Sequence, residues 1–248
     1  MSALVLALAA GAVIGLALGA LGGGGSVLAV PALIYLLGFD PVGATTASLV
    51  IVTLTSVTAL VAHGRDGNVR WRTGLLFAAA GIGPAMLGGA LAARIPSGVL
   101  TAAFALVAGA AAVRMLRSRP AAEGPVAVRP VRAASVGAGL GAVTGVLGVG
   151  GGFLAVPALV GVLGLRMRNA VGTSLLVITV NSLAALATRA GTVQHLDWAV
   201  VGPFVAAAVL GSWDGKRLSE KISGNTLQRI FAVLLLAVAA FMLIDALR

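Results

Sequence analysis

The chain has 248 residues, of which 59% are hydrophobic and only 10% are charged. Soluble domains carry about 25% charged residues, so this composition largely excludes a soluble enzyme, a disordered chain and a free nucleic-acid-binding protein. The formal net charge of +10 is better explained by basic residues that orient loops at a membrane. Cysteine is absent, which removes disulfides, thiolate metal sites and cysteine nucleophiles.

Apolar segments follow one another along the whole chain, and most have the roughly 20 residues that a helix needs to cross a bilayer. The eight segments are 3–37, 44–62, 73–93, 98–113, 133–164, 170–188, 198–213 and 226–244. The most polar stretch, 114–132, is rich in arginine and proline and is predicted to link two halves. We therefore expect a first membrane repeat at 1–116, a cytoplasmic linker at 117–132 and a second membrane repeat at 133–248.

The two halves are related in sequence by a shift of 126 residues. Segments 19–38 and 145–164 read GALGGGGSVLAVPALIYLLG and GVLGVGGGFLAVPALVGVLG, and they are identical at 13 of 20 positions. The same register pairs Gly11 with Gly137, Gly15 with Gly141, Ser48 with Ser174, Thr53 with Thr179 and Ser56 with Ser182. This self-similarity indicates an internal duplication.

The first segment of each half is too long for one crossing and too short for two. At about 1.5 Å per residue, a single helix of this length would measure roughly 50 Å. Glycine clusters at 22–25 and 148–152 lie near the middle of these segments, and glycine adopts turn conformations without steric cost. We therefore predict a helix, a glycine break at membrane depth and a short helix that returns to its own side.

The distribution of basic residues favours this hairpin interpretation over single crossings. With a hairpin in both halves, every lysine and arginine except Arg94, Arg189 and Arg248 falls on the cytoplasmic side, as the positive-inside rule expects. Each half then holds a hairpin and three crossings, so the second half is upside down relative to the first. The predicted fold is an all-α integral membrane protein with an inverted-topology repeat and both termini outside, as in many secondary transporters.

Both halves carry motifs that point to one membrane-protein family. A glycine-rich turn runs into LAVPAL in each half, AVGTSLLVI at 170–178 has a weaker counterpart ATTASLVIV at 44–52, and G-x-x-L-A/S occurs at 88–92 and 215–219. The sequence thereby resembles the TauE/SafE sulfite exporter family over nearly its whole length. The resemblance implies a small multi-pass permease of the bacterial cytoplasmic membrane, with sulfite and organosulfur anions as usual substrates. The segment GSWDGKRL at 211–218 is more polar than the family pattern at this position.

The predicted binding site uses the positive ends of the two short returning helices. Helix N-termini carry about half a positive charge and free N–H donors, so they bind anions. Hydroxyls and one amide from the next crossings would complete the site. The predicted substrate-binding residues are Gly24, Gly25, Ser26, Thr45, Thr46, Ser48, Gly150, Gly151, Gly152, Thr173, Ser174 and Asn181. The alternatives are tight helix packing by the glycines and hydroxyls that bond to their own helices.

Ionisable residues near the ends of the apolar segments supply candidates for proton coupling. His63 and Asp214 are the strongest, because each abuts an apolar segment, and the alternative for both is a solvated loop contact. Trp71, Trp198 and Trp213 lie at segment edges and are predicted to be interfacial anchors.

The predicted function is secondary transport of sulfite, a sulfonate or a similar small anion by alternating access. The alternatives are transport of another anion such as sulfate or a carboxylate, a channel, or a non-transporting subunit of a membrane complex. No metalloprotease motif, intramembrane carboxylate pair or nucleophile–base motif points to an enzyme, and no cofactor or metal is expected. The expected partners are the small anion and the lipid bilayer, without nucleic acid, and small-residue faces such as 83–89 leave a homo-oligomer open.

Overall fold

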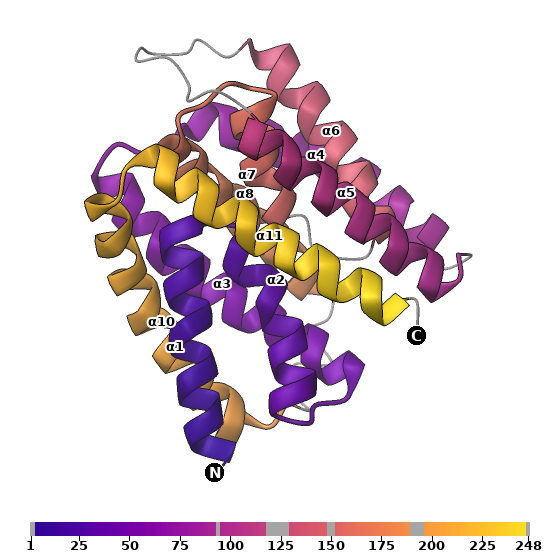
Figure 1. Ribbon diagram of the computed structural model, residues 1–248, viewed down its shortest axis with the longest axis vertical. Coiled ribbons are helices and arrows are strands. Elements are labelled where there is room, and N and C mark those ends of the chain that lie inside the picture. The colour runs from indigo at the N-terminus through magenta and orange to yellow at the C-terminus, as the bar shows by residue number, and fades with distance from the viewer. Residues whose placement is uncertain (1–2, 93–94, 118–128, 148–151, 189–195, 247–248) are drawn as a thin grey trace.

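A computed structural model describes residues 3–92, 95–117, 129–147, 152–188 and 196–246 (Figure 1). These residues are almost entirely helical, and they contain no strand. Six of the described helices are long and apolar enough to cross a membrane. They are α1 (Ala3–Leu21), α3 (Pro41–Arg65), α5 (Ser97–Arg117), α8 (Met167–Thr188), α10 (Trp198–Lys221) and α11 (Gly224–Ala246). The protein is therefore an all-α integral membrane protein, as its composition predicts.

The remaining elements complete the same order of helices in both halves. They are α2 (Gly24–Pro31), the π-helical turn η1 (Ala32–Leu36), α4 (Trp71–Ala92), α6 (Pro130–Leu147) and α7 (Gly152–Gly161). The first half runs α1, α2 with η1, α3, α4 and α5, and the second runs α6, α7, α8, α10 and α11. Each half is thus a long helix, a short helix and three further helices, which matches the predicted segments closely.

The largest difference from the predicted segments is at the end of α10. The apolar segment was expected to end near residue 213, whereas the helix continues to Lys221. The added turns are stabilised locally, because Lys216 pairs with Glu220 one turn later, with 2.6 Å between nitrogen and oxygen. Trp213 and Asp214 therefore lie inside a helix, while Trp71 and Trp198 begin theirs.

The first half contains a glycine break between two helices. α1 ends at Leu21, Gly22 has a φ of +72°, and α2 begins at Gly24. Side chains other than hydrogen disfavour that φ, so glycine is what permits this turn. Figure 1 shows α2 and η1 running back toward the end at which α1 begins. In the second half, α6 ends at Leu147 and α7 begins at Gly152, and the residues between them lie outside the described ranges.

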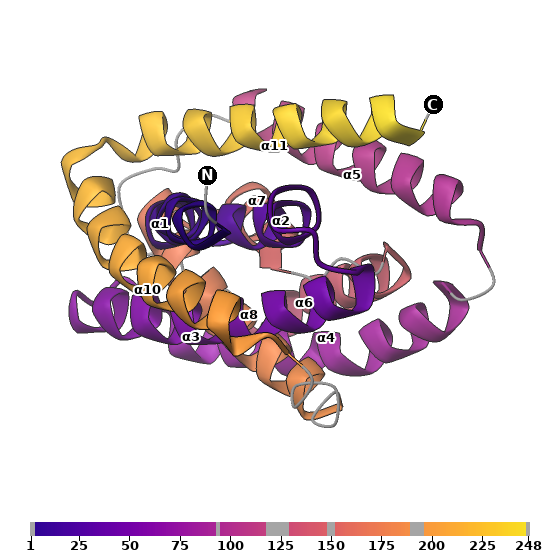
Figure 2. The same cartoon turned by 90° about the horizontal axis from the view of Figure 1, so that it is seen from below.

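Helices of the two halves are interleaved in space. α1 packs along α10, and their counterparts α6 and α4 pack along each other. The counterparts α5 and α11 pack together, as do α3 with α8 and α2 with α7. Figure 2 shows α5 and α11 as one outer layer along the upper edge, with α1 and α2 on its inner side, toward the middle of the molecule. Exchanging the two halves converts the α1–α10 pair into the α6–α4 pair and leaves the other three pairs unchanged, which is the pattern of a duplicated chain. The inverted orientation across a bilayer and the boundaries at 116 and 132 stay predictions.

Glycine lets the two long helix pairs approach backbone to backbone. Three glycines spaced by four residues line one face of α1, and three line one face of α6. They are Gly11, Gly15 and Gly19 in α1, and Gly137, Gly141 and Gly145 in α6. A Cβ on Gly15 would lie 2.0 Å from the carbonyl oxygen of Ala208 in α10, and a Cβ on Gly141 would lie 2.2 Å from that of Gly81 in α4. Membrane helices associate through small residues of this kind, because lipid offers no hydrophobic driving force.

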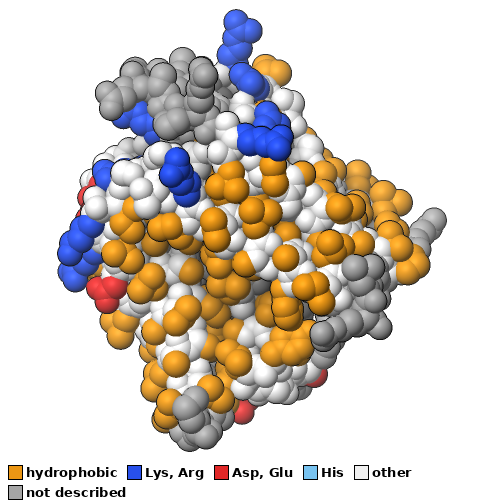
Figure 3. All heavy atoms as spheres, viewed as in Figure 1, with side chains coloured by type: hydrophobic (Ala, Val, Ile, Leu, Met, Phe, Trp, Pro, Cys, Tyr) orange, Lys and Arg blue, Asp and Glu red, His pale blue; other side chains and the backbone are white. Residues whose placement is uncertain are grey.

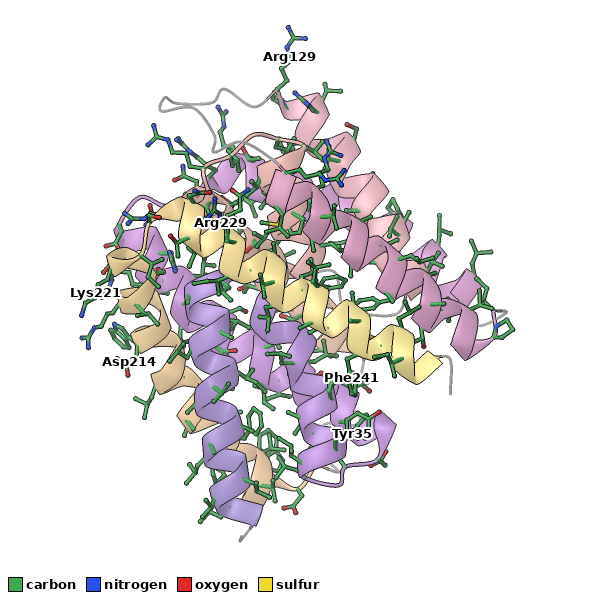
Figure 4. The ribbon with its side chains drawn as sticks, viewed as in Figure 1. Tyr35, Arg129, Asp214, Lys221, Arg229 and Phe241 are labelled. Carbon is green, nitrogen blue, oxygen red and sulfur yellow. The ribbon has the colours of Figure 1, made fainter. Side chains whose placement is uncertain are left out.

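The basic side chains are unevenly distributed along the molecule. Figure 3 shows the Lys and Arg side chains of one face gathered toward its upper end, above a broad hydrophobic surface. Figure 4 places Arg129, Arg229 and Lys221 in that upper part, and Tyr35 with Phe241 toward the other end. The rings of Tyr35 and Phe241 meet edge to face, 6.3 Å apart. Basic residues gathered toward one end agree with helices that span a bilayer.

Candidate functional site

The glycine break of the first half lies against the start of α7. A Cβ built on Gly23 would lie 2.3 Å from the carbonyl oxygen of Gly152 and 2.6 Å from the Cα of Phe153. Gly23 immediately precedes α2, and Gly152 is the first residue of α7. The N-terminal ends of the two short helices, one from each half, are therefore adjacent.

These two helix ends are electrostatically positive and lack acidic neighbours of their own. The first four N–H groups of a helix have no acceptor within it, and neither α2 nor α7 has an acidic residue in its first turn. The N-cap of α2 is Gly23, which has no side chain to accept from these donors. Residues 152–160 of α7 are buried, so solvent screens the positive end of this helix only weakly. The arrangement suits a small anion.

Helix α8 brings a hydroxyl to the first break. A Cβ on Gly22 would lie 2.5 Å from Oγ of Ser174 and 3.3 Å from the carbonyl oxygen of Val171. Ser174 is fully buried, and its hydroxyl donates to the Val171 carbonyl at 2.8 Å. The hydroxyl would have to leave that carbonyl in order to donate to an anion. Of the residues predicted for the site, the structure thus places Ser174 and Gly152 beside Gly22 and Gly23.

Thr173, next to Ser174 in sequence, makes a different contact. Its Oγ1 accepts a hydrogen bond from the backbone N–H of Arg70 at 3.1 Å, and Arg70 immediately precedes α4. Its methyl group lies 3.1 Å from a Cβ built on Gly74 in the first turn of α4. Thr173 therefore ties α8 to the start of α4.

The other predicted residues lie on the first turn of α2, on the second turn of α3 and within α8. Gly24, Gly25 and Ser26 form the first turn of α2, so their backbone lies at its positive end. The buried Ser48 donates to the carbonyl of Thr45 at 2.8 Å, which is bonding within its own helix. The remaining three described positions are Thr45 and the buried Thr46 in α3 and the half-buried Asn181 in α8. Gly150 and Gly151 lie outside the described residues.

The crossing of α3 and α8 contains a polar contact that the sequence analysis did not propose as part of a site. Oγ1 of Thr179 lies 3.0 Å from Oγ of Ser56, and both side chains are buried. Thr179 Oγ1 also lies 2.7 Å from the carbonyl oxygen of Leu175. A sequence signal was present, because Ser56 matches Ser182 and Thr179 matches Thr53 in the repeat, and all four lie inside apolar segments. We interpreted these residues only as markers of the duplication.

His63 is enclosed by protein near the C-terminal end of α3. Only 3% of the residue is exposed, and Nε2 lies 3.0 Å from the carbonyl oxygen of Gly19 in α1. Beside it, Lys216 of α10 pairs with Asp66, which follows α3, and with Glu220. The hydrogen bond from Lys216 lowers the pKa of the Asp66 carboxyl below its ordinary value.

Asp214, the second candidate for proton coupling, lies in a different environment. Its side chain is 69% exposed, and its carboxylate lies 3.6 Å from the guanidinium of Arg217. Figure 4 shows it pointing outward from α10. Of the two candidates, His63 is therefore buried next to the first glycine break, and Asp214 is exposed on the surface.

Comparison with known proteins identifies the family. The family profile described as "Sulfite exporter TauE/SafE" matches residues 7–242. Two proteins of Xylella fastidiosa, from strains Temecula1 and 9a5c, are both named "Probable membrane transporter protein". Each is 34% identical to this chain over 250 aligned positions, which cover 97% of this chain and 95% of the relative. No solved structure matches the chain. The chain is therefore a multi-pass, all-helical member of the TauE/SafE sulfite exporter family of membrane transporters.

Proposed function

We propose that this protein is a secondary transporter that carries small sulfur-containing anions, such as sulfite or a sulfonate, across a bacterial cytoplasmic membrane. The observation that carries the proposal is the contact between Gly23 and Gly152, which places the positive ends of α2 and α7 side by side. The family description supports the substrate class, because it names sulfite.

Two adjacent helix ends can hold an anion without a buried arginine. Each end contributes about half a positive charge, so the pair offers about one charge to a ligand. A sulfite or sulfonate group presents three oxygen acceptors, which can take N–H donors from two directions at once. The proposed donors and lining residues are the predicted set: Gly24, Gly25, Ser26, Thr45, Thr46, Ser48, Gly150, Gly151, Gly152, Thr173, Ser174 and Asn181.

The origin of the two helix ends suggests how transport occurs. Gly23 belongs to the first half and Gly152 to the second, so a movement of one half against the other changes the site between them. In an inverted repeat, such rocking exposes a central site to one side of the membrane and then to the other. We propose this alternating access, with both termini outside and residues 117–132 in the cytoplasm.

Flux in proteoliposomes tests the proposal. Purified protein is reconstituted with sulfite inside, an outward gradient is imposed, and release is compared with protein-free liposomes and with competing sulfate. We expect protein-dependent sulfite release that sulfate competes with poorly. Flux of another anion without sulfite would reject the sulfur-anion substrate class. Absence of flux for every anion under several pH gradients would overturn the transporter and favour a non-transporting subunit.

A charge placed in the first turn of α2 tests the site itself. In Ser26→Asp, the carboxylate should stabilise this helix end by about 0.3–1 kcal/mol and should repel the anion. Ser26→Asn is the matched control, because it has nearly the same shape without the charge. We expect Ser26→Asp to fold normally and to lose flux, while Ser26→Asn keeps it. Equal flux in Ser26→Asp and the unmodified protein would remove this helix end from the site.

A further inference from the structure

His63 is a titratable side chain inside a membrane-spanning helix, a location that costs free energy and usually marks a functional residue. Nε2 lies 3.0 Å from the carbonyl oxygen of Gly19. A carbonyl only accepts hydrogen bonds, so Nε2 carries a proton and donates it. In the neutral ring, Nδ1 is then the unprotonated nitrogen.

Nδ1 is the atom that requires an explanation. It is buried, and it has no hydrogen-bond partner among the residues that the structure describes. A buried polar atom without a partner is destabilising. A glutamine amide could make the bond to Gly19, and an apolar side chain could fill the space, so a purely structural role does not need this second nitrogen. A residue that takes up and releases a proton does need it.

The charged groups around His63 can accommodate the positive charge that its side chain carries only when it is protonated. Lys216 is paired with both Asp66 and Glu220, so this cluster has one net negative charge and would attract an imidazolium. α1 and α2 contain no ionisable side chain, and Arg168 of α8 donates to the backbone carbonyl of Glu220 at 3.0 Å. The two carboxylates therefore favour protonation of His63, and the ammonium of Lys216 opposes it.

The bond to Gly19 links His63 to the first glycine break. Gly19 lies in the last turn of α1, where the carbonyls form the negative end of the helix dipole. The proposed anion binds at the positive end of α2, across Gly22 and Gly23 from that turn. We infer that His63 is the proton-binding group of this transporter and that its protonation favours anion binding at the break. This inference rests on the proposed function.

Coupling between the two ligands works in both directions. One proton binds Nδ1 and converts neutral imidazole into imidazolium, the anion binds at the break, and both leave on the other side of the membrane. By linkage, the proton increases the anion's affinity by the same factor by which the anion increases proton occupancy. Coupled sites typically change affinity about 5- to 150-fold, and we expect roughly tenfold here.

Two histidines in the chain make the protonation state directly observable. A His195→Gln protein labelled with 15N-histidine reports on His63 alone by NMR. Without anion and at alkaline pH, we expect the tautomer with the proton on Nε2. Adding methanesulfonate at constant pH should increase the imidazolium fraction. An unchanged histidine spectrum, in protein shown to transport this anion, would overturn the inference.

Coupled transport provides the second test. Methanesulfonate keeps one negative charge over the pH range used, whereas sulfite itself takes up a proton near neutral pH. With an imposed pH gradient, we expect the unmodified protein to accumulate methanesulfonate against its concentration gradient. His63→Gln should keep downhill exchange but lose accumulation, because the amide can donate to Gly19 and cannot titrate. Asp214→Asn is the control and should accumulate normally.

The outcomes separate this inference from the proposed function. If the unmodified protein moves no anion, the proposed function fails and this inference fails with it. If it moves anions but ignores the pH gradient, or if His63→Gln accumulates like the unmodified protein, only the role of His63 is rejected. If His63→Gln does not fold, the NMR measurement on the His195→Gln protein decides.

Discussion

Gly23→Ala tests the contact between the two glycine breaks most directly. Gly23 has φ −57° and ψ −20°, a conformation that alanine adopts readily. The effect of the substitution therefore comes from steric overlap of the new Cβ alone. The new Cβ would lie 2.3 Å from the carbonyl oxygen of Gly152 and 2.6 Å from the Cα of Phe153. Both are backbone atoms of α7 and cannot rotate away. Ordinary contacts begin at 3.4 Å, so the two helix ends must separate by about 1 Å.

This displacement sets the expected size of the effect. Overpacking of this kind costs about 1–3 kcal/mol, and a misplacement of about 1 Å can slow a process about 100-fold. We therefore expect a lower thermal unfolding midpoint in detergent, followed by tryptophan fluorescence, and a 10- to 100-fold lower anion flux per reconstituted protein. Gly83→Ala is the matched control, because its Cβ meets nothing within 4 Å. Unchanged flux in folded Gly23→Ala would refute the idea that the breaks meet at the transport site.

Three further predictions concern packing, pH and topology. Gly141→Leu should push α6 away from α4 and abolish a monodisperse peak in size-exclusion chromatography, whereas Gly139→Leu, whose Cβ meets nothing within 4 Å, should elute normally. The folded pKa of Asp66 is lowered by its hydrogen bond to the α10 lysine, so its stabilisation is present above its ordinary pKa and lost as the pH falls through the lowered one. The unfolding midpoint should accordingly fall more steeply on acidification below about pH 4 than it does in Asp66→Asn, and parallel curves would contradict this. Cysteines in Ser2→Cys and Leu247→Cys should react with an impermeant reagent from outside, and labelling of either only from the cytoplasm would reject the hairpin topology.

The fold class and the helix positions could be predicted from the sequence because both depend on local properties. The length of an apolar segment decides whether it can cross a bilayer, and glycine clusters decide where such a segment can turn. The expected segment 170–188 corresponds to α8 at Met167–Thr188, and the expected break at 22–25 corresponds to the turn at Gly22 and Gly23. The end of α10 was misjudged, because ion pairing within the helix extends it beyond its apolar part.

The candidate site was only partly predictable, because neighbouring residues on a helix point in different directions. Thr173 and Ser174 are equivalent as polar residues in an apolar segment. A helix turns about 100° per residue, so Ser174 reaches Gly22 while Thr173 binds the N–H of Arg70. The Ser56–Thr179 contact also joins residues more than a hundred positions apart, and the repeat marks both residues without showing that they meet.

Composition, hydropathy and the internal repeat by themselves determined that this chain is a duplicated, multi-pass helical membrane protein. Composition and hydropathy depend only on the residues of each segment, and the repeat is visible by comparing two segments of the sequence. Only the tertiary structure decided which surfaces meet. His63 and Asp214 look alike in the sequence, each at the edge of an apolar segment, yet α1 and α10 bury His63 and leave Asp214 exposed. That difference follows from the close packing of α1 on α10 along their small residues. The contact joins helices from opposite halves of the chain, and membrane helices select such partners by shape rather than by hydrophobicity.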